Sequence, residues 1–141
     1  MNTLALTTPI GELLRVPRRS PYRFVLVPAA VVAAVAHIPV TGQHLREAPY
    51  MGVLFIVLTA ALLILATAAL IRDTTAVYLL TVLTCALAIL GYAATRTVAF
   101  PLLADDVGNW LDPLGVVSVL SESVALLVGV AALGRTVPGD V

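Results

Sequence analysis

The segment YMGVLFIVLTAALLILATAALI, residues 50 to 71, decides the fold, because it is long, apolar and free of charged side chains. A transmembrane helix needs about 20 apolar residues to cross roughly 30 Å of hydrocarbon. Three further runs of this kind lie at about residues 24 to 41, 76 to 96 and 113 to 134. The sequence therefore predicts an all-α integral membrane protein whose four spans form an antiparallel four-helix bundle.

The overall composition agrees with a membrane protein. The chain is 60% hydrophobic and 11% charged, with a mean hydropathy of +1.04, whereas soluble domains carry about 25% charged residues. Eight arginines balance eight acidic side chains, so no basic surface for nucleic acid is expected. No P-loop or dinucleotide-binding motif occurs, so no nucleotide is expected either. The single cysteine, Cys85, lies in an apolar run, which excludes an intrachain disulfide and a thiolate zinc motif.

The positions of the arginines predict the orientation in the membrane. Only Arg46 and Arg96 fall on one side of the four spans, and the other six fall on the opposite side. The positive-inside rule then places both termini in the cytoplasm of a multi-pass cell-membrane protein. Residues 1 to 23 and 135 to 141 become cytoplasmic tails, and residues 24 to 134 become the transmembrane domain. Because little of the chain lies outside the bilayer, we expect a homo-oligomer or a partner in a membrane complex.

Two long connections are expected on the extracytoplasmic face. Residues 37 to 50, HIPVTGQHLREAPY, hold both histidines, and residues 97 to 113, TVAFPLLADDVGNWLDP, hold an acidic pair. Pro39 is expected to loosen or end the first helix. If that helix continued instead, His44 and Glu47 would lie about 20° and 80° from the direction of His37. Asp112, followed by a proline, is typical of a helix N-cap, so it predicts the start of the last span.

These connections also carry a resemblance to a known group of proteins. The runs AHIPVTGQHLREAPYMGVLF, residues 36 to 55, and TRTVAFPLLADDVGNWLDPLGVVSVLSES, residues 95 to 123, resemble those of small four-span membrane proteins from high-GC bacteria. The resemblance covers nearly all of the chain after the N-terminal tail. It implies the four-helix layout, and it carries no activity and no functional residues.

The polar side chains of the outer face predict a metal site. Imidazole nitrogen and carboxylate oxygen together suit copper, zinc or iron, and no thiolate is needed. We therefore predict a divalent transition metal with a redox or metal-handling role, and whether the protein is an enzyme stays open. The alternatives are solvated loop residues on a non-catalytic accessory subunit, or a histidine that exchanges a proton. The candidate ligands are His37, His44, Glu47, Asp105 and Asp106.

Two further polar residues are expected inside or beside the membrane. Glu122 lies about 15 Å below the cap of the last helix, where an unpaired acidic side chain costs about 2.5–3.5 kcal/mol. It is a protonated acid bonded across helices, part of a proton or ion pathway, or a deep ligand of the outer site. Ser118, one turn earlier, is a candidate hydrogen-bond partner of Glu122. Arg96 is expected to reach lipid phosphate, to pair with Asp105 or Asp106, or to hold an anionic substrate.

Overall fold

The computed structural model describes residues 20–72 and 74–135. Within these ranges the chain is all-helical, and its four long helices are each long and apolar enough to cross a membrane. The prediction of four long apolar helices is therefore confirmed, whereas the predicted tails lie almost entirely outside the described residues. The long helices are α2 (Arg23–Glu47), α3 (Pro49–Ile71), α4 (Thr75–Thr97) and α5 (Pro113–Gly134), and a short 3-10 helix, η1, spans Ala104–Asp106.

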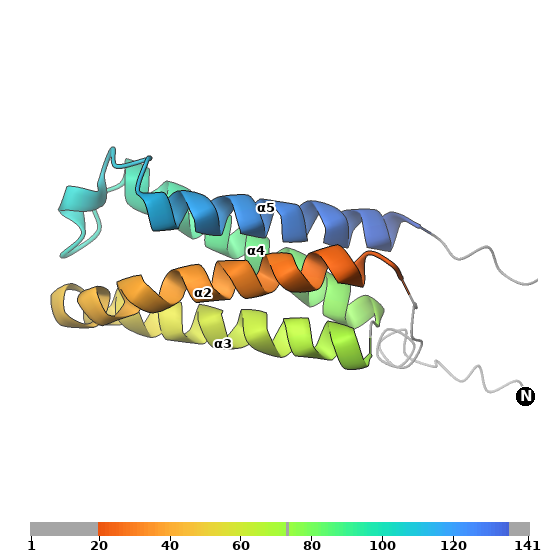
Figure 1. Ribbon diagram of the computed structural model, residues 1–141. Coiled ribbons are helices and arrows are strands. Elements are labelled where there is room, and N and C mark those ends of the chain that lie inside the picture. Colours follow the sequence, from red (N-terminus) through yellow and green to blue (C-terminus); the bar gives the residue numbers. More distant parts are fainter. Residues whose placement is uncertain (1–19, 73, 136–141) are drawn as a thin grey trace, which may run out of the picture.

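The four long helices lie side by side and form one elongated bundle (Figure 1). The α2–α3 junction and the connection that contains η1 lie at the same end, which we call the η1 end. The start of α2, the turn between α3 and α4, and the end of α5 lie at the opposite end, which we call the terminal end. The two polar stretches singled out in the sequence thus approach each other at the η1 end.

The first helix extends further than the sequence predicts. α2 continues through Pro39 to Glu47, and a single residue separates it from α3. A proline removes one backbone hydrogen bond, and in membrane helices side-chain hydroxyls help to satisfy nearby carbonyl groups. The carbonyl group that Pro39 leaves without a helix donor is that of Val35. The Thr41 hydroxyl donates to another carbonyl oxygen beside the proline, that of His37, at 2.7 Å. The expectation that this helix ends near residue 41 is wrong, and both histidines lie on one continuous helix.

Mostly alanine and leucine side chains form the core in the middle of the bundle and at its terminal end, together with Cys85 and Tyr78 of α4. Alanine allows helix backbones to approach closely, which is the main source of packing between helices in lipid. This part of the bundle is therefore closed by direct helix contacts. One core cluster contains Ala30, Ala33, Ala34, Leu62, Ala66, Cys85 and Ala125, and a second contains Leu26, Ala69, Tyr78 and Ala132.

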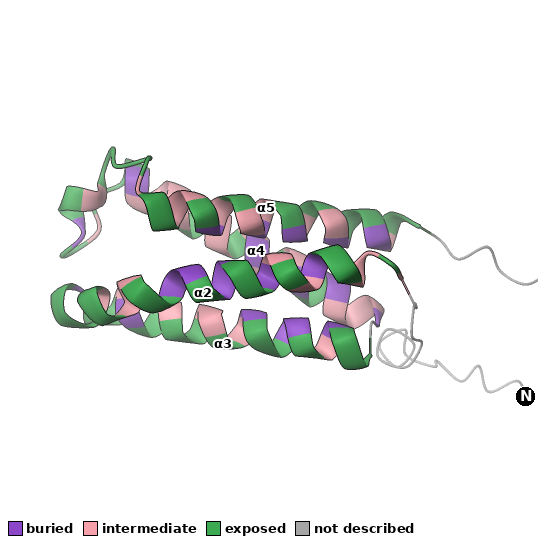
Figure 2. Cartoon of the chain, in the orientation of Figure 1, coloured by how far each residue is buried: buried purple, intermediate pink, exposed green. Residues whose placement is uncertain are grey.

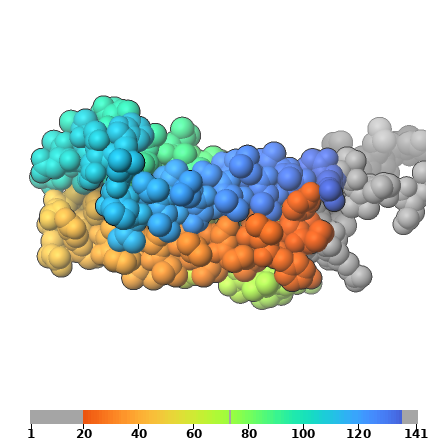
Figure 3. Space-filling model, turned by 45° about the horizontal axis from the view of Figure 1, so that its top comes forward, coloured from red at the N-terminus to blue at the C-terminus, as the bar shows by residue number. Residues whose placement is uncertain are grey.

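Helices α3 and α4 are the least closely packed pair of chain neighbours in the bundle. They contact each other far less than α2 contacts α3 or than α4 contacts α5. Residues 53–61 of α3 and 86–95 of α4 include no buried side chain, and Figure 2 shows the buried part of α3 mainly toward the terminal end. On another face, α2 and α5 lie against each other (Figure 3). The bundle is therefore closed between α2 and α5 and loosely packed between α3 and α4 near the η1 end.

Hydrogen bonds hold the α4–α5 connection against the helices. The Tyr50 hydroxyl donates to the carbonyl oxygen of Pro101 at 2.6 Å, and the Tyr92 hydroxyl donates to that of Trp110 at 2.9 Å. Asp112 accepts a hydrogen bond of 2.7 Å from a backbone N–H in the first turn of α5, as the sequence predicts. The connection is thus fixed near its start and at its end.

Candidate functional site

A cavity of about 440 Å³ lies between the four long helices, in the half of the bundle toward the η1 end. All four helices and η1 contribute side chains to its wall, and most of these side chains are apolar. Its polar side chains form a deep group on α2 and α5 and a second group at the mouth of the cavity. The lining includes His37, His44, Arg96, Asp106, Asp112 and Glu122.

The deep group consists of His37, Ser118 and Glu122, and all three side chains are buried. The Ser118 hydroxyl oxygen lies 3.1 Å from Glu122 Oε1 and 3.2 Å from His37 Nε2. The direct distance from His37 Nε2 to Glu122 Oε1 is 3.7 Å. Glu122 is 1% exposed, so this carboxyl group meets protein atoms and the cavity and not the surrounding lipid. The hydrogen bond between Ser118 and Glu122 that the sequence suggests is present.

The hydrogen bonds of the deep group require one shared proton. His37 Nδ1 lies 2.7 Å from the carbonyl oxygen of Ala33, and a carbonyl can only accept, so Nδ1 carries a hydrogen. Ser118 has one hydroxyl hydrogen but contacts both Glu122 and His37 Nε2 at hydrogen-bonding distance. Both contacts are hydrogen bonds only when a further hydrogen lies on Glu122 or on Nε2. The group therefore has two complete arrangements, which differ in where this proton lies.

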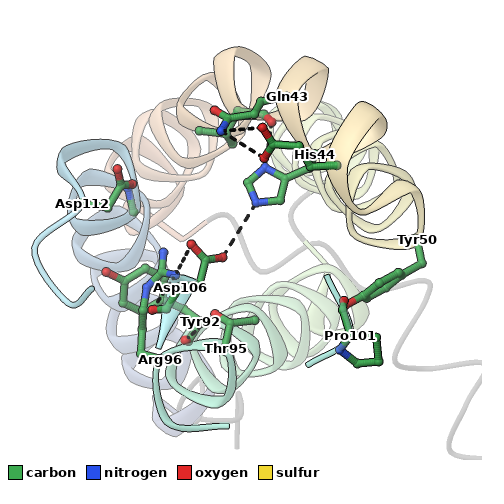
Figure 4. Close-up of polar contacts among 12 residues, drawn as sticks. Gln43, His44, Tyr50, Tyr92, Thr95, Arg96, Pro101, Asp106 and Asp112 are labelled. Carbon is green, nitrogen blue, oxygen red and sulfur yellow. Dashed lines mark hydrogen bonds and ion pairs between the residues drawn. The ribbon is translucent and has the colours of Figure 1, made fainter. Parts of the chain in front are cut away.

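At the mouth of the cavity, Asp106 lies between a cation and an imidazole. Arg96 Nη1 is 3.0 Å from Asp106 Oδ1, and His44 Nε2 is 4.0 Å from Asp106 Oδ2. Figure 4 shows Asp106 and His44 directed toward each other from opposite sides. The Arg96 guanidinium also lies 4.6 Å from the centre of the Tyr92 ring. Of the three interpretations of Arg96, pairing with an acidic residue is the arrangement seen here.

A single aromatic ring connects the two histidines along one wall. The ring centre of Phe55 lies 5.2 Å from that of His37 and 4.9 Å from that of His44. His44 Nδ1 donates to the carbonyl oxygen of Val40 at 2.9 Å, so both imidazoles use Nδ1 on the helix backbone. Their Nε2 atoms are left for Ser118 in the deep group and for Asp106 at the mouth.

In the structure, the predicted metal ligands lie at different locations and do not form one site. His44 at the end of α2 and Asp106 of η1 come together, whereas His37 belongs to the deep group. Glu47 accepts hydrogen bonds from Gln43 at 3.1 and 3.3 Å on the exposed surface, and Asp105 is also exposed. Among the described residues, no group of three or more histidine, cysteine, aspartate or glutamate side chains could hold a metal ion. The metal stays a prediction of the sequence, and the structure does not assign His37 to it.

Sequence reasoning missed two aromatic residues of the cavity. Tyr92 precedes Arg96 by one helical turn, so the spacing alone could have indicated their contact. Phe55 lies on α3 and carried no signal, because its contact with the two histidines depends on how α2 and α3 pack. The deep group was found only in part, since Ser118 and Glu122 share a helix but His37 comes from another.

Comparisons of the chain with protein-family models, with curated proteins and with solved structures give no match. The resemblance to small four-span proteins of high-GC bacteria therefore stays a prediction.

Proposed function

We propose that this protein binds a small, mainly apolar molecule from the membrane inside its helix bundle. The observation that carries the proposal is a cavity with apolar walls that ends on three buried polar side chains. Binding sites for small molecules are typically apolar cavities with a few polar groups that orient the ligand. The deep group of His37, Ser118 and Glu122 would bind the polar end of the molecule, and the walls toward the η1 end would contact its apolar part.

The proposed molecule enters from the lipid between α3 and α4. This route is supported by the few contacts between these helices and by cavity-lining side chains that are also exposed on the outside of the bundle. Leu54 on α3 is 55% exposed and Leu87 on α4 is 60% exposed, and both line the cavity. Gly91 lies in the same wall, is exposed, and would have no neighbour within 4 Å of an added Cβ atom. A molecule dissolved in hydrocarbon could therefore reach the cavity without crossing water.

The proposal includes an orientation in the cell membrane. We place the helices antiparallel, the η1 end on the extracytoplasmic side and both termini in the cytoplasm, because the arginine distribution supports this direction. The cavity then opens toward the outer leaflet. A homo-oligomer or a partner in a membrane complex, both expected from the sequence, can be tested by crosslinking in native membranes.

Photolabelling tests the binding function directly. The full chain in lipid nanodiscs is irradiated with a neutral long-chain alcohol that carries an alkyl diazirine, and labelled residues are mapped by mass spectrometry. We expect labels on cavity residues such as Phe55 and Thr84 at a higher yield than on residues that face lipid only, such as Ile64. Equal labelling of the cavity and the lipid-facing surface would contradict the proposal.

A pair of glycine substitutions tests the entry route. Gly91→Leu adds a side chain in the opening between α3 and α4, where the Cβ atom meets nothing within 4 Å, so the helix can keep its conformation. Gly42→Leu is the matched control, because Gly42 is also exposed within a helix and has no neighbour within 4 Å of a Cβ atom, but it does not line the cavity. We expect Gly91→Leu to lower cavity labelling several-fold and Gly42→Leu to leave it unchanged. An equal effect of the two substitutions would exclude this route.

A further inference from the structure

The charges around the cavity are matched except at its deep end. Arg96 pairs with Asp106 at 3.0 Å. Asp112 caps the N-terminus of α5, where the helix dipole favours a negative charge. Glu122 lies on the same helix about 15 Å further into the bundle, and its closest charge partner is His37, which is positive only when protonated. Glu122 is thus a buried carboxyl group without a permanent counter-charge among the described residues.

No described arginine can supply that charge, because each of them lies near or beyond the end of a helix. Arg23 begins α2, Arg72 and Arg135 follow α3 and α5, and Arg46 and Arg96 lie in the last turns of α2 and α4. Among the described titratable side chains, His37 on α2 lies 3.7 Å from Glu122, and Cys85 on α4 is buried and cannot carry a positive charge. The only titratable side chain of α3 is Tyr50, which bonds to the connection at the η1 end.

We propose that the molecule bound in the cavity carries one positive charge and places it against Glu122. This inference rests on the proposed binding function and names the chemical class of the ligand, an apolar monocation such as a quaternary phosphonium or a protonated amine. In the low-dielectric interior an opposite charge stabilises the carboxylate far more than it would in water. The apolar walls match the body of such a molecule, and the ring of Phe55 offers a face that attracts cations.

The hydrogen bonds of the deep group explain how the charge of Glu122 is balanced both when the cavity is empty and when it holds a ligand. Without a ligand, the shared proton completes the hydrogen bonds among Glu122, Ser118 and His37. When a cation binds, it replaces the proton as the positive charge that balances the Glu122 carboxylate. The proton then leaves through Ser118 and His37 toward the cavity. The two packed core clusters close the terminal end, so proton and ligand both leave through the half of the bundle toward the η1 end.

Tetraphenylphosphonium is the probe for this class, and tetraphenylborate is its matched control, because the two ions share their shape and differ in charge. The full chain in nanodiscs is titrated with each ion by calorimetry, with empty nanodiscs as the reference. We expect saturable binding of about one phosphonium per chain and no saturable binding of the borate. We expect Glu122→Gln to weaken phosphonium binding by about tenfold or more, and Glu122→Asp to weaken it less. Glu47→Gln changes an exposed carboxylate and should leave binding unchanged.

Several outcomes overturn the inference. Binding of tetraphenylborate as tight as that of the phosphonium would show that charge is not recognised. Unchanged phosphonium binding in Glu122→Gln would show that Glu122 is not the partner. Thermal unfolding shows whether each variant is folded. If Glu122→Gln is not folded, equally tight binding of the phosphonium and the borate by the unaltered chain is the overturning result. Cavity labelling by the neutral photoprobe together with no phosphonium binding would remove this inference and leave the binding function standing.

Discussion

The two halves of the bundle are built from the same four helices, yet one is packed and the other encloses a cavity. Toward the terminal end, buried alanines and leucines of α2, α3 and α5 pack with Tyr78 and Cys85 of α4. Toward the η1 end, α3 and α4 bury almost no side chains, and polar groups of α2, α4 and α5 line the cavity. Helices in lipid gain little from burying apolar surface, because hydrocarbon solvates that surface already. Space can therefore persist in one half while the packed half holds the helices together.

The largest expected effect comes from removing a leucine side chain in the packed half. Leu62 is fully buried, so Leu62→Ala should lower the free energy of unfolding by about 2–4 kcal/mol through lost contacts and an unfilled space. Leu54 has the same side chain on the same helix but lines the cavity and is 55% exposed. Leu54→Ala should cost less than about 0.5 kcal/mol. Reversible unfolding in mixed detergent micelles measures both variants.

An equal decrease in the free energy of unfolding in Leu62→Ala and Leu54→Ala would contradict the difference between the two halves. Such a result would mean that the wall of the cavity contributes as much to stability as the core does. The contact of α3 with α4 would then have to be closer in the membrane than the structure shows.

A smaller effect is expected from the ion pair at the mouth. Asp106→Asn leaves the buried Arg96 guanidinium without its counter-charge, which should cost about 1–2 kcal/mol because Asp106 is itself partly exposed. It should also make the α4–α5 connection more sensitive to proteases added on the side of the η1 end. Asp105→Asn is the control, since its side chain is exposed and should change stability by less than about 0.5 kcal/mol. Identical behaviour of the two variants would show that the ion pair does not hold the connection.

The sequence predicted the spans well because the bilayer imposes their length and polarity. Runs without charge, bounded by arginine, proline and aspartate, can scarcely fold in another way at this length. The cap at Asp112 was predicted for a similar reason, since it depends only on local backbone geometry. The end of α2 was missed because Pro39 is tolerated inside a membrane helix, where only one hydrogen bond is lost.

The site was predictable where its residues share a helix or lie close together in the sequence, as Arg96 and Asp106 do. Ser118 and Glu122 are four residues apart, so their hydrogen bond could be proposed from spacing. The link from Ser118 to His37 depends on the rotation of α2 against α5, and apolar helices that are uniformly hydrophobic give no signal for that rotation. The topology predicted that residues 37 to 50 and 97 to 113 lie at the same end of the bundle. Without the helix rotations, the sequence could not separate His37 from the pair of His44 and Asp106.

The smallest expected effect concerns metal content, on which the sequence and the geometry disagree. The sequence predicts that His44→Ala abolishes stoichiometric copper, zinc or iron. In the structure Asp106 already pairs with Arg96, whose positive charge opposes a divalent cation at the same carboxylate, and the Nε2 atom of His37 is bonded to Ser118. From this geometry we expect His44→Ala to leave the metal content of the purified protein unchanged, measured by inductively coupled plasma mass spectrometry after purification without chelators. One equivalent of metal that disappears in His44→Ala would restore the predicted metal site, and it would place that site at the mouth of the cavity and not in the deep group.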